Sequence, residues 1–102
     1  MQDDRAMAEL EEVLERCRAR GDALFEGRAQ LLCGKAQGSK GKVGKALRHM
    51  QHAQSLFEGL GARELQAETF QAMYSVHVAL NQHFEALEAA RRSRALYRFV
   101  RD

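Results

Sequence analysis

Apolar residues recur at spacings of three and four positions along most of the chain, and this spacing predicts helices. In the first predicted helix, over residues 5–20, the apolar positions form one stripe flanked by polar residues. Gly21 ends this helix, because glycine just past a helix C-terminus readily takes a left-handed backbone conformation. The stripe consists of Met7, Leu10, Val13, Leu14 and Cys17.

The same spacing predicts four further helices, over residues 23–37, 43–59, 62–80 and 83–101. Short connections join all five, so successive helices should run antiparallel. The positions expected to face inward are Phe25, Ala29, Leu32, Cys33 and Ala36; Ala46, Leu47, Met50, Ala53, Leu56 and Phe57; Leu65, Thr69, Ala72, Met73, Val76 and Leu80; and Ala86, Leu87, Ala90, Ser93, Leu96, Tyr97 and Val100. The pattern therefore predicts an all-α fold of antiparallel helical hairpins.

Composition agrees with this prediction and argues against a sheet. The chain has no Pro, a single Thr and no Ile, and it is rich in Ala, Leu, Glu, Gln and Arg. These abundant residues favour helices, whereas a pleated sheet surface favours β-branched side chains. The length of 102 residues suits one domain.

Charge and targeting patterns point to an ordinary cytoplasmic protein. The net charge of +2 gives no strong steering field, although residues 23–61 are more basic than the rest. No apolar run is long enough for a membrane span, and the acidic N-terminus does not resemble a signal peptide. Two Cys make no disulfide framework, so we expect reduced thiols, a cytoplasmic location and no membrane partner.

An internal repeat of 40 residues relates the predicted helices. Shifting the chain by 40 positions places residues 43–59 on 83–99, and residues 23–37 on 63–77, with matching apolar phase. The first helix fits one period earlier, since Gly21 then falls on Gly61. We interpret the chain as two and a half helix-turn-helix units: a half repeat over 1–22 and repeats over 23–61 and 62–102.

These residues resemble the tetratricopeptide (TPR) repeat family. The family places a small residue and Leu early in its second helix, a small residue seven positions on, and Leu three later. The matching positions are Ala46-Leu47, Ala53 and Leu56, and again Ala86-Leu87, Ser93 and Leu96. The 40-residue period is similar to the longer repeats of bacterial signalling proteins and transcription activators. The resemblance implies an α-solenoid of about 2.5 repeats that acts as a non-catalytic interaction domain.

The resemblance also implies a binding groove lined by the first helices of successive repeats. Helical spacing independently places each trio of groove positions on one helix face, apart from the expected core stripe. Two of them, Arg28 and Lys35, are suited to a carboxylate or acidic segment of a partner. The predicted groove residues are Arg28, Leu31, Lys35, Glu68, Gln71 and Ser75.

A glycine-rich, basic segment at residues 38–45 is the strongest candidate for other chemistry. Its nearest register to a nucleotide-binding P-loop lacks the first Gly and the final hydroxyl, and no strand precedes it. Lys40, Lys42 and Lys45 are possible basic contacts to nucleotide or nucleic acid. We expect a long, frayed, solvated turn instead, because glycine is unfavourable inside helices.

Other reactive residues indicate structural roles. His49 and His52 are three apart on one helix, but a metal site would need two further ligands, so we predict no metal and no cofactor. Cys33 lies at a packing position and has no His placed beside it by helical spacing. Tyr97, Phe99 and Val100 near the C-terminus are possible oligomer contacts, in a homodimer or against a further helix.

The sequence therefore predicts no enzyme, but a protein–protein interaction or oligomerisation scaffold within a larger regulatory protein. The alternative is a standalone adaptor or chaperone that binds a peptide in its groove. Nucleic-acid binding is disfavoured, because Glu85 and Glu88 dilute the positive charge of the arginines in the last helix.

Overall fold

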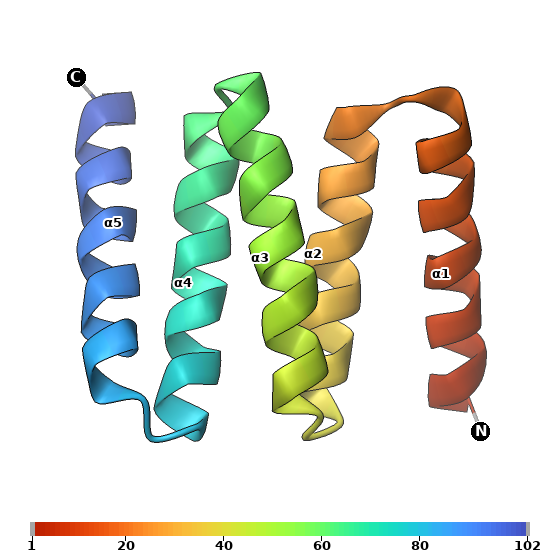
Figure 1. Cartoon of the computed structure of the whole chain (residues 1–102), viewed down its shortest axis with the longest axis horizontal. Coiled ribbons are helices and arrows are strands. Elements are labelled where there is room, and N and C mark those ends of the chain that lie inside the picture. The colour runs from red at the N-terminus through yellow and green to blue at the C-terminus, as the bar shows by residue number, and fades with distance from the viewer. Residues whose placement is uncertain (1, 102) are drawn as a thin grey trace.

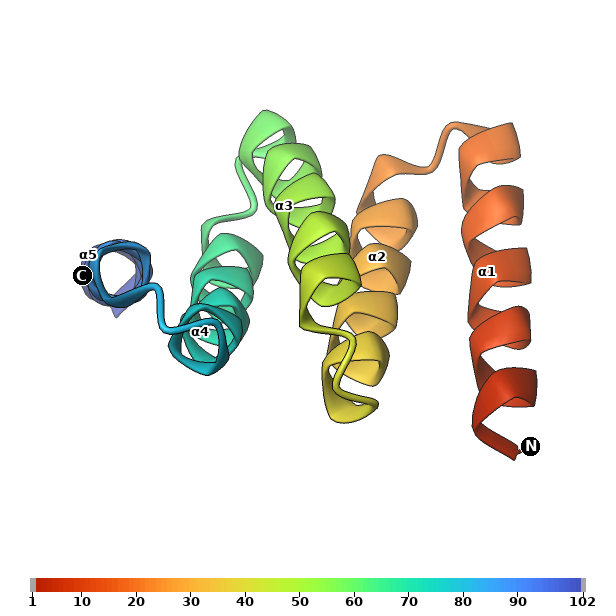
Figure 2. The same ribbon diagram turned by 60° about the horizontal axis from the view of Figure 1, so that its bottom comes forward.

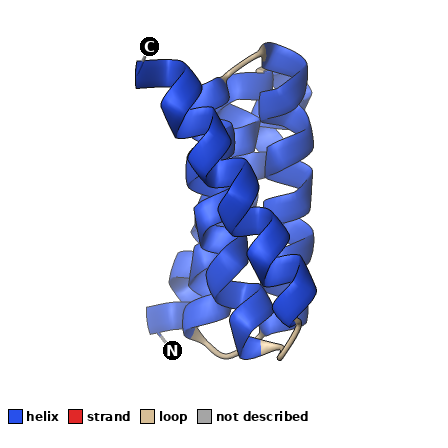
Figure 3. Ribbon diagram, turned by 90° about the vertical axis from the view of Figure 1, so that its left-hand side faces the viewer, coloured by secondary structure: helices blue, strands red, loops and turns tan. Residues whose placement is uncertain are grey.

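The computed structural model describes residues 2–101 of the chain, and it is built entirely from helices and short turns over those residues (Figure 3). The predicted all-α fold is confirmed, and each helix boundary lies within a few residues of its expected place. None of these helices combines the length and apolarity needed to span a bilayer. The helices are α1 (Gln2–Arg20), α2 (Ala23–Ser39), α3 (Val43–Leu60), α4 (Arg63–Ala79) and α5 (His83–Arg101).

The five helices stand side by side in chain order, with α1 and α5 as the two end helices of the row (Figures 1 and 2). Each helix packs on its sequence neighbours, most extensively α2 on α3 and α4 on α5, and a small contact also joins α2 to α4. The array measures 38 × 31 × 17 Å. Because it is thin, every helix keeps one side open to solvent.

Two of the turns share one geometry, 40 residues apart. At the first, the amide of Gly21 donates to the Arg18 carbonyl over 3.1 Å; at the other, the amide of Gly61 donates to the Glu58 carbonyl over the same 3.1 Å. The two glycines have φ values of 68° and 67°. This left-handed backbone favours glycine, so both positions stop a helix for the same reason.

The remaining two turns also match at this offset. Lys42 donates its amide to the Gln37 carbonyl over 2.9 Å, and Gln82 donates to the His77 carbonyl over 2.8 Å. The central residue has a positive φ in both turns, at Gly41 (80°) and Asn81 (58°). The expectation of a long, frayed turn at 38–45 is therefore wrong, because α2 continues to Ser39 and α3 begins at Val43.

Helix α2 is rotated relative to its predicted face. Phe25 and Leu32, expected inside, are 54% and 53% exposed, whereas Leu31, expected in the groove, is only 5% exposed. The reason is a seam of small and polar residues against α3. A Cβ on Gly27 would lie 2.5 Å from Cε1 of Phe57, so the missing side chain is what lets α3 approach this closely.

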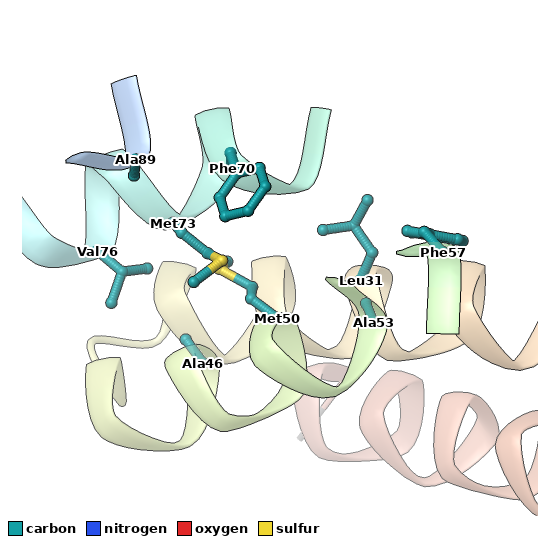
Figure 4. Packing of buried hydrophobic residues seen from close by; sticks show 9 residues of the cluster. All are labelled: Leu31, Ala46, Met50, Ala53, Phe57, Phe70, Met73, Val76 and Ala89. Carbon is teal, nitrogen blue, oxygen red and sulfur yellow. The ribbon is translucent and has the colours of Figure 1, made fainter. Parts of the chain in front are cut away.

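The core lies between α2, α3 and α4, with α5 closing one side (Figure 4). Large side chains from α3 and α4 meet there, and alanines on α3 let the helices approach. Within the predicted stripe of α3, Phe57 and Ala53 are fully buried. The cluster consists of Leu31, Ala46, Met50, Ala53, Phe57, Phe70, Met73, Val76 and Ala89.

The two end helices depart from the predicted burial for a different reason. Val13, Leu87 and Val100 were expected to face inward, yet they are 45%, 53% and 44% exposed. Among the described residues, α1 packs only on α2 and α5 only on α4, so each end helix buries just the central part of its apolar stripe. The flanks of that stripe stay open to solvent.

Candidate functional site

The surface between α2 and α4 is hollowed along its length, and we call this feature the α2–α4 channel. One pocket of about 420 Å³ occupies one half, and a second of about 340 Å³ continues it. Lys35 lines both pockets and marks their junction. The channel residues are Arg28, Leu31, Leu32, Lys35, Gly38 and Ser39 from α2, Val43 and Met50 from α3, and Leu65, Glu68, Ala72, Ser75, Val76 and Ala79 from α4.

Charged groups of the channel already have partners within the chain. The Lys35 ammonium lies 3.4 Å from the carboxylate of Glu68, and both side chains are 47% exposed. The Arg28 guanidinium lies 5.7 Å from the ring centroid of Phe25. An exposed ion pair of this kind contributes at most about 1 kcal/mol, so a ligand carboxylate can displace Glu68 at small cost.

The structure brings five of the six predicted groove residues to the channel and separates the sixth. Gln71 lies instead on the seam between α4 and α5, where its Oε1 accepts a hydrogen bond of 3.3 Å from the Tyr97 hydroxyl. Leu31 lines the channel but belongs to the core. Sequence reasoning missed the exposed Leu32 and its neighbour Leu65 as channel residues, because their apolarity suggested core positions.

A buried glutamine links α2 to α3. Gln30 is 2% exposed, and its Oε1 lies 2.7 Å from Nδ1 of His49. Its Nε2 lies 3.2 Å from Nδ1 of His52. The amide thus accepts a hydrogen bond from Nδ1–H of His49 and donates one to Nδ1 of His52, so the two rings carry their protons on different nitrogens. No apolar pattern could have identified this bridge.

Further charged groups extend this bridge toward α1. The Nε2 of His52 lies 3.6 Å from the Glu26 carboxylate, which Arg18 of α1 approaches at 3.5 Å. Burial lowers the pKa of His49, and the charges of His52, Arg18 and Arg48 lower it further, against an opposing effect of Glu11. The network favours a neutral His49 and joins three helices.

Cys33 and the histidines show no arrangement for catalysis or metal binding. Cys33 is fully buried, and burial together with nearby Glu11 raises the pKa of its thiol. A raised pKa reduces the thiolate that a nucleophile needs. Across residues 5–101, whose side chains the structure describes, no group of three or more His, Cys, Asp or Glu side chains lies close enough to hold a metal ion.

The other predicted contacts lie in two separate places. Lys42 and Lys45 are exposed where α3 begins, with Lys40 half-buried beside them. At the C-terminal end, the Phe99 side chain is 59% exposed. The Arg63 guanidinium lies 4.1 Å from the centroid of the Phe99 ring. Tyr97 is half-buried, and its hydroxyl donates a hydrogen bond to Gln71 of α4. Val100 is open to solvent.

Comparison of the chain with models of protein families, with curated proteins and with solved structures found no match.

Proposed function

We propose that this chain is a TPR-like helical-repeat scaffold that binds a protein segment in the α2–α4 channel, as a non-catalytic, cytoplasmic interaction domain. The repeat interpretation is supported by the matched turns, whose hydrogen bonds recur at an offset of 40 residues. The binding interpretation rests on one observation. The open channel carries a leucine that is 53% exposed, Leu32, between the cations of Arg28 and Lys35.

The channel chemistry favours a partner segment that combines carboxylates with an apolar side chain. Leu32 and Leu65 offer an apolar floor, which gains from losing contact with water. Arg28 offers a guanidinium fork that pairs with carboxylates in a bidentate way, while Lys35 exchanges Glu68 for a ligand carboxylate. We therefore infer a segment with Asp or Glu beside Leu or Phe.

A displayed library of random peptides tests this inference directly. The intact chain is immobilised, and binding peptides are selected in low salt and sequenced. We expect enrichment of peptides with acidic residues next to Leu or Phe. Repetition with the variant Arg28→Glu/Lys35→Glu should lose that enrichment, because the reversed charges repel a ligand carboxylate.

The matched control is Lys45→Glu/Arg91→Glu, which makes the same charge change at exposed positions that line neither pocket of the channel. This control should select the same peptides as the unmodified chain. Enriched peptides without acidic residues, or equal losses in both variants, would show that the channel assignment is wrong.

A second candidate function, self-association, is favoured by apolar side chains on α5. Phe84 is 76% exposed and Leu87 is 53% exposed near the start of that helix. Exposed apolar groups clustered on one element are typical of protein interfaces. Sedimentation at several concentrations should then show a dimer that Phe84→Ser/Leu87→Ser makes monomeric. A monomer at every concentration would exclude this candidate.

A further inference from the structure

A second surface pocket, which we call the arginine pocket, lies on the seam between α4 and α5. It has a volume of about 470 Å³ and is lined by Gln71, Arg94, Tyr97, Arg98 and Arg101. It is separate from the α2–α4 channel and shares none of its lining residues. None of its lining residues is acidic.

Within the described residues, the three arginines of this pocket lack a partner of the kind that Arg92 has. Arg92, on the same helix, lies 3.7 Å from the Glu88 carboxylate and 5.5 Å from the Phe70 ring centroid. Within the described residues, no carboxylate or aromatic ring pairs with Arg94, Arg98 or Arg101.

The spacing of these cations makes them repel one another in the free protein. Arg94 and Arg98 are four residues apart and Arg98 and Arg101 are three apart, so their side chains are neighbours on the helix surface. Like charges at these spacings destabilise a helix. A bound anion would relieve this repulsion, so binding should also stabilise the fold.

Neutral groups in the pocket add donors. The Tyr97 hydroxyl donates to Oε1 of Gln71 over 3.3 Å. This bond occupies the amide oxygen and leaves the amide nitrogen of Gln71, with two N–H groups, for a ligand. Since each guanidinium carries five N–H donors and no acceptor, the pocket is rich in donors and suits a ligand with many oxygen acceptors.

We propose that the arginine pocket binds a phosphate-chain anion such as a di- or triphosphate. One carboxylate has two oxygens and is satisfied by a single guanidinium fork. From Arg94 to Arg101 the helix rises by about 10 Å, so a longer anion with several charged oxygens is needed to engage all three arginines. This proposal does not depend on peptide binding in the α2–α4 channel.

Inorganic tripolyphosphate is the probe, titrated into the full chain by calorimetry at low salt. We expect saturable binding that weakens as salt rises, because exposed charges are screened. The variant Arg94→Gln/Arg98→Gln should bind more weakly by about fivefold for each arginine, from the upper range of exposed ion pairs. The control Arg91→Gln removes an exposed charge from the same helix outside the pocket, and should change affinity less than twofold.

Two further measurements test the site and the ligand class. The side-chain amide resonance of Gln71 should shift on titration, and tripolyphosphate should raise the melting temperature of the unmodified chain but not of the double variant. Citrate, a tricarboxylate, should bind more weakly than tripolyphosphate. Equal binding of citrate, equal losses in Arg91→Gln, an unmoved Gln71 amide or no binding of tripolyphosphate would each overturn the proposal.

Discussion

The close contact of α2 with α3 predicts opposite effects for the same substitution at two glycines. Gly27→Ala would place a Cβ 2.5 Å from Cε1 of Phe57 and 3.0 Å from two other ring carbons. The Phe57 ring is fully buried, so any movement of the ring must also displace the side chains packed around it. At the exposed Gly44, in the first turn of α3, an added Cβ meets no described atom within 4 Å apart from its chain neighbours and the adjacent backbone of its own helix.

The magnitudes follow from two opposing effects. Alanine favours a helix over glycine by about 0.5–1 kcal/mol, whereas overpacking a core costs about 1–3 kcal/mol. We therefore expect Gly27→Ala to lower the free energy of unfolding by about 1–2 kcal/mol, since the clash outweighs the helix gain. Gly44→Ala has no clash and should raise the free energy by about 0.5 kcal/mol.

Urea denaturation followed by far-UV circular dichroism measures both changes, with an unchanged m value as evidence that two-state unfolding persists. Combining Gly27→Ala with Phe57→Leu should recover part of the loss, because a smaller side chain makes room for the new methyl group. That recovery appears as a coupling energy between the two sites. If Gly27→Ala stabilised the chain as Gly44→Ala does, the close packing of α2 on Phe57 would be refuted.

Three further predictions concern the buried groups between α2 and α3. Gln30→Met should lower the free energy of unfolding by about 1–3 kcal/mol, measured in urea, since it leaves ring nitrogens without partners; no loss would contradict the bridge. The lowered pKa of His49 means that protonation opposes folding. The free energy of unfolding should therefore keep the full contribution of neutral His49 above the unfolded pKa of about 6.5. It should lose this contribution as pH falls through the lowered folded pKa. His49→Gln should reduce this decline, and the exposed control His83→Gln should not; equal slopes in all three chains would contradict the assignment. Cys33 should react with a thiol reagent only after unfolding, as mass spectrometry of the labelled chain can show, and rapid labelling in the native state would contradict its burial.

Periodicity predicted α3 correctly because its buried face is apolar. Met50, Ala53 and Phe57 all lie in the core, at the spacings that a helix stripe requires. The turns after α1 and α3 could also be predicted from the sequence, since Gly21 and Gly61 lie where a left-handed backbone ends each helix. In these segments, the conformation that each residue prefers locally is also the one that the packing of the helices requires.

The face of α2 could not be predicted because its seam against α3 contains little apolar surface. Gly27 and Gly34 are buried there through close approach, and Gln30 through hydrogen bonds to two histidines. An apolar pattern assigns such positions to solvent, which places Leu32 inside and Leu31 outside. The predicted groove residues consequently include Arg28 and Lys35, which line the channel, but not the exposed Leu32 beside them.

The separation of Gln71 from the other groove residues also depends on tertiary contacts. Helical spacing placed it with Glu68 and Ser75 on one face of α4. That face is flanked by α2 on one side and α5 on the other, and the hydrogen bond with Tyr97 assigns Gln71 to the α5 side. Sequence alone does not reveal which neighbour each flank meets.

The affinity of one selected acidic-apolar peptide for three forms of the chain tests the proposed function most directly. Fluorescence anisotropy at low salt compares the unmodified chain, Arg28→Glu/Lys35→Glu and the control Lys45→Glu/Arg91→Glu, after thermal melting has shown that all three are folded. The proposal predicts a loss of about tenfold or more in the channel variant, from reversal of two ligand contacts, and an unchanged affinity in the control. Equal affinities in all three forms would contradict binding in the α2–α4 channel.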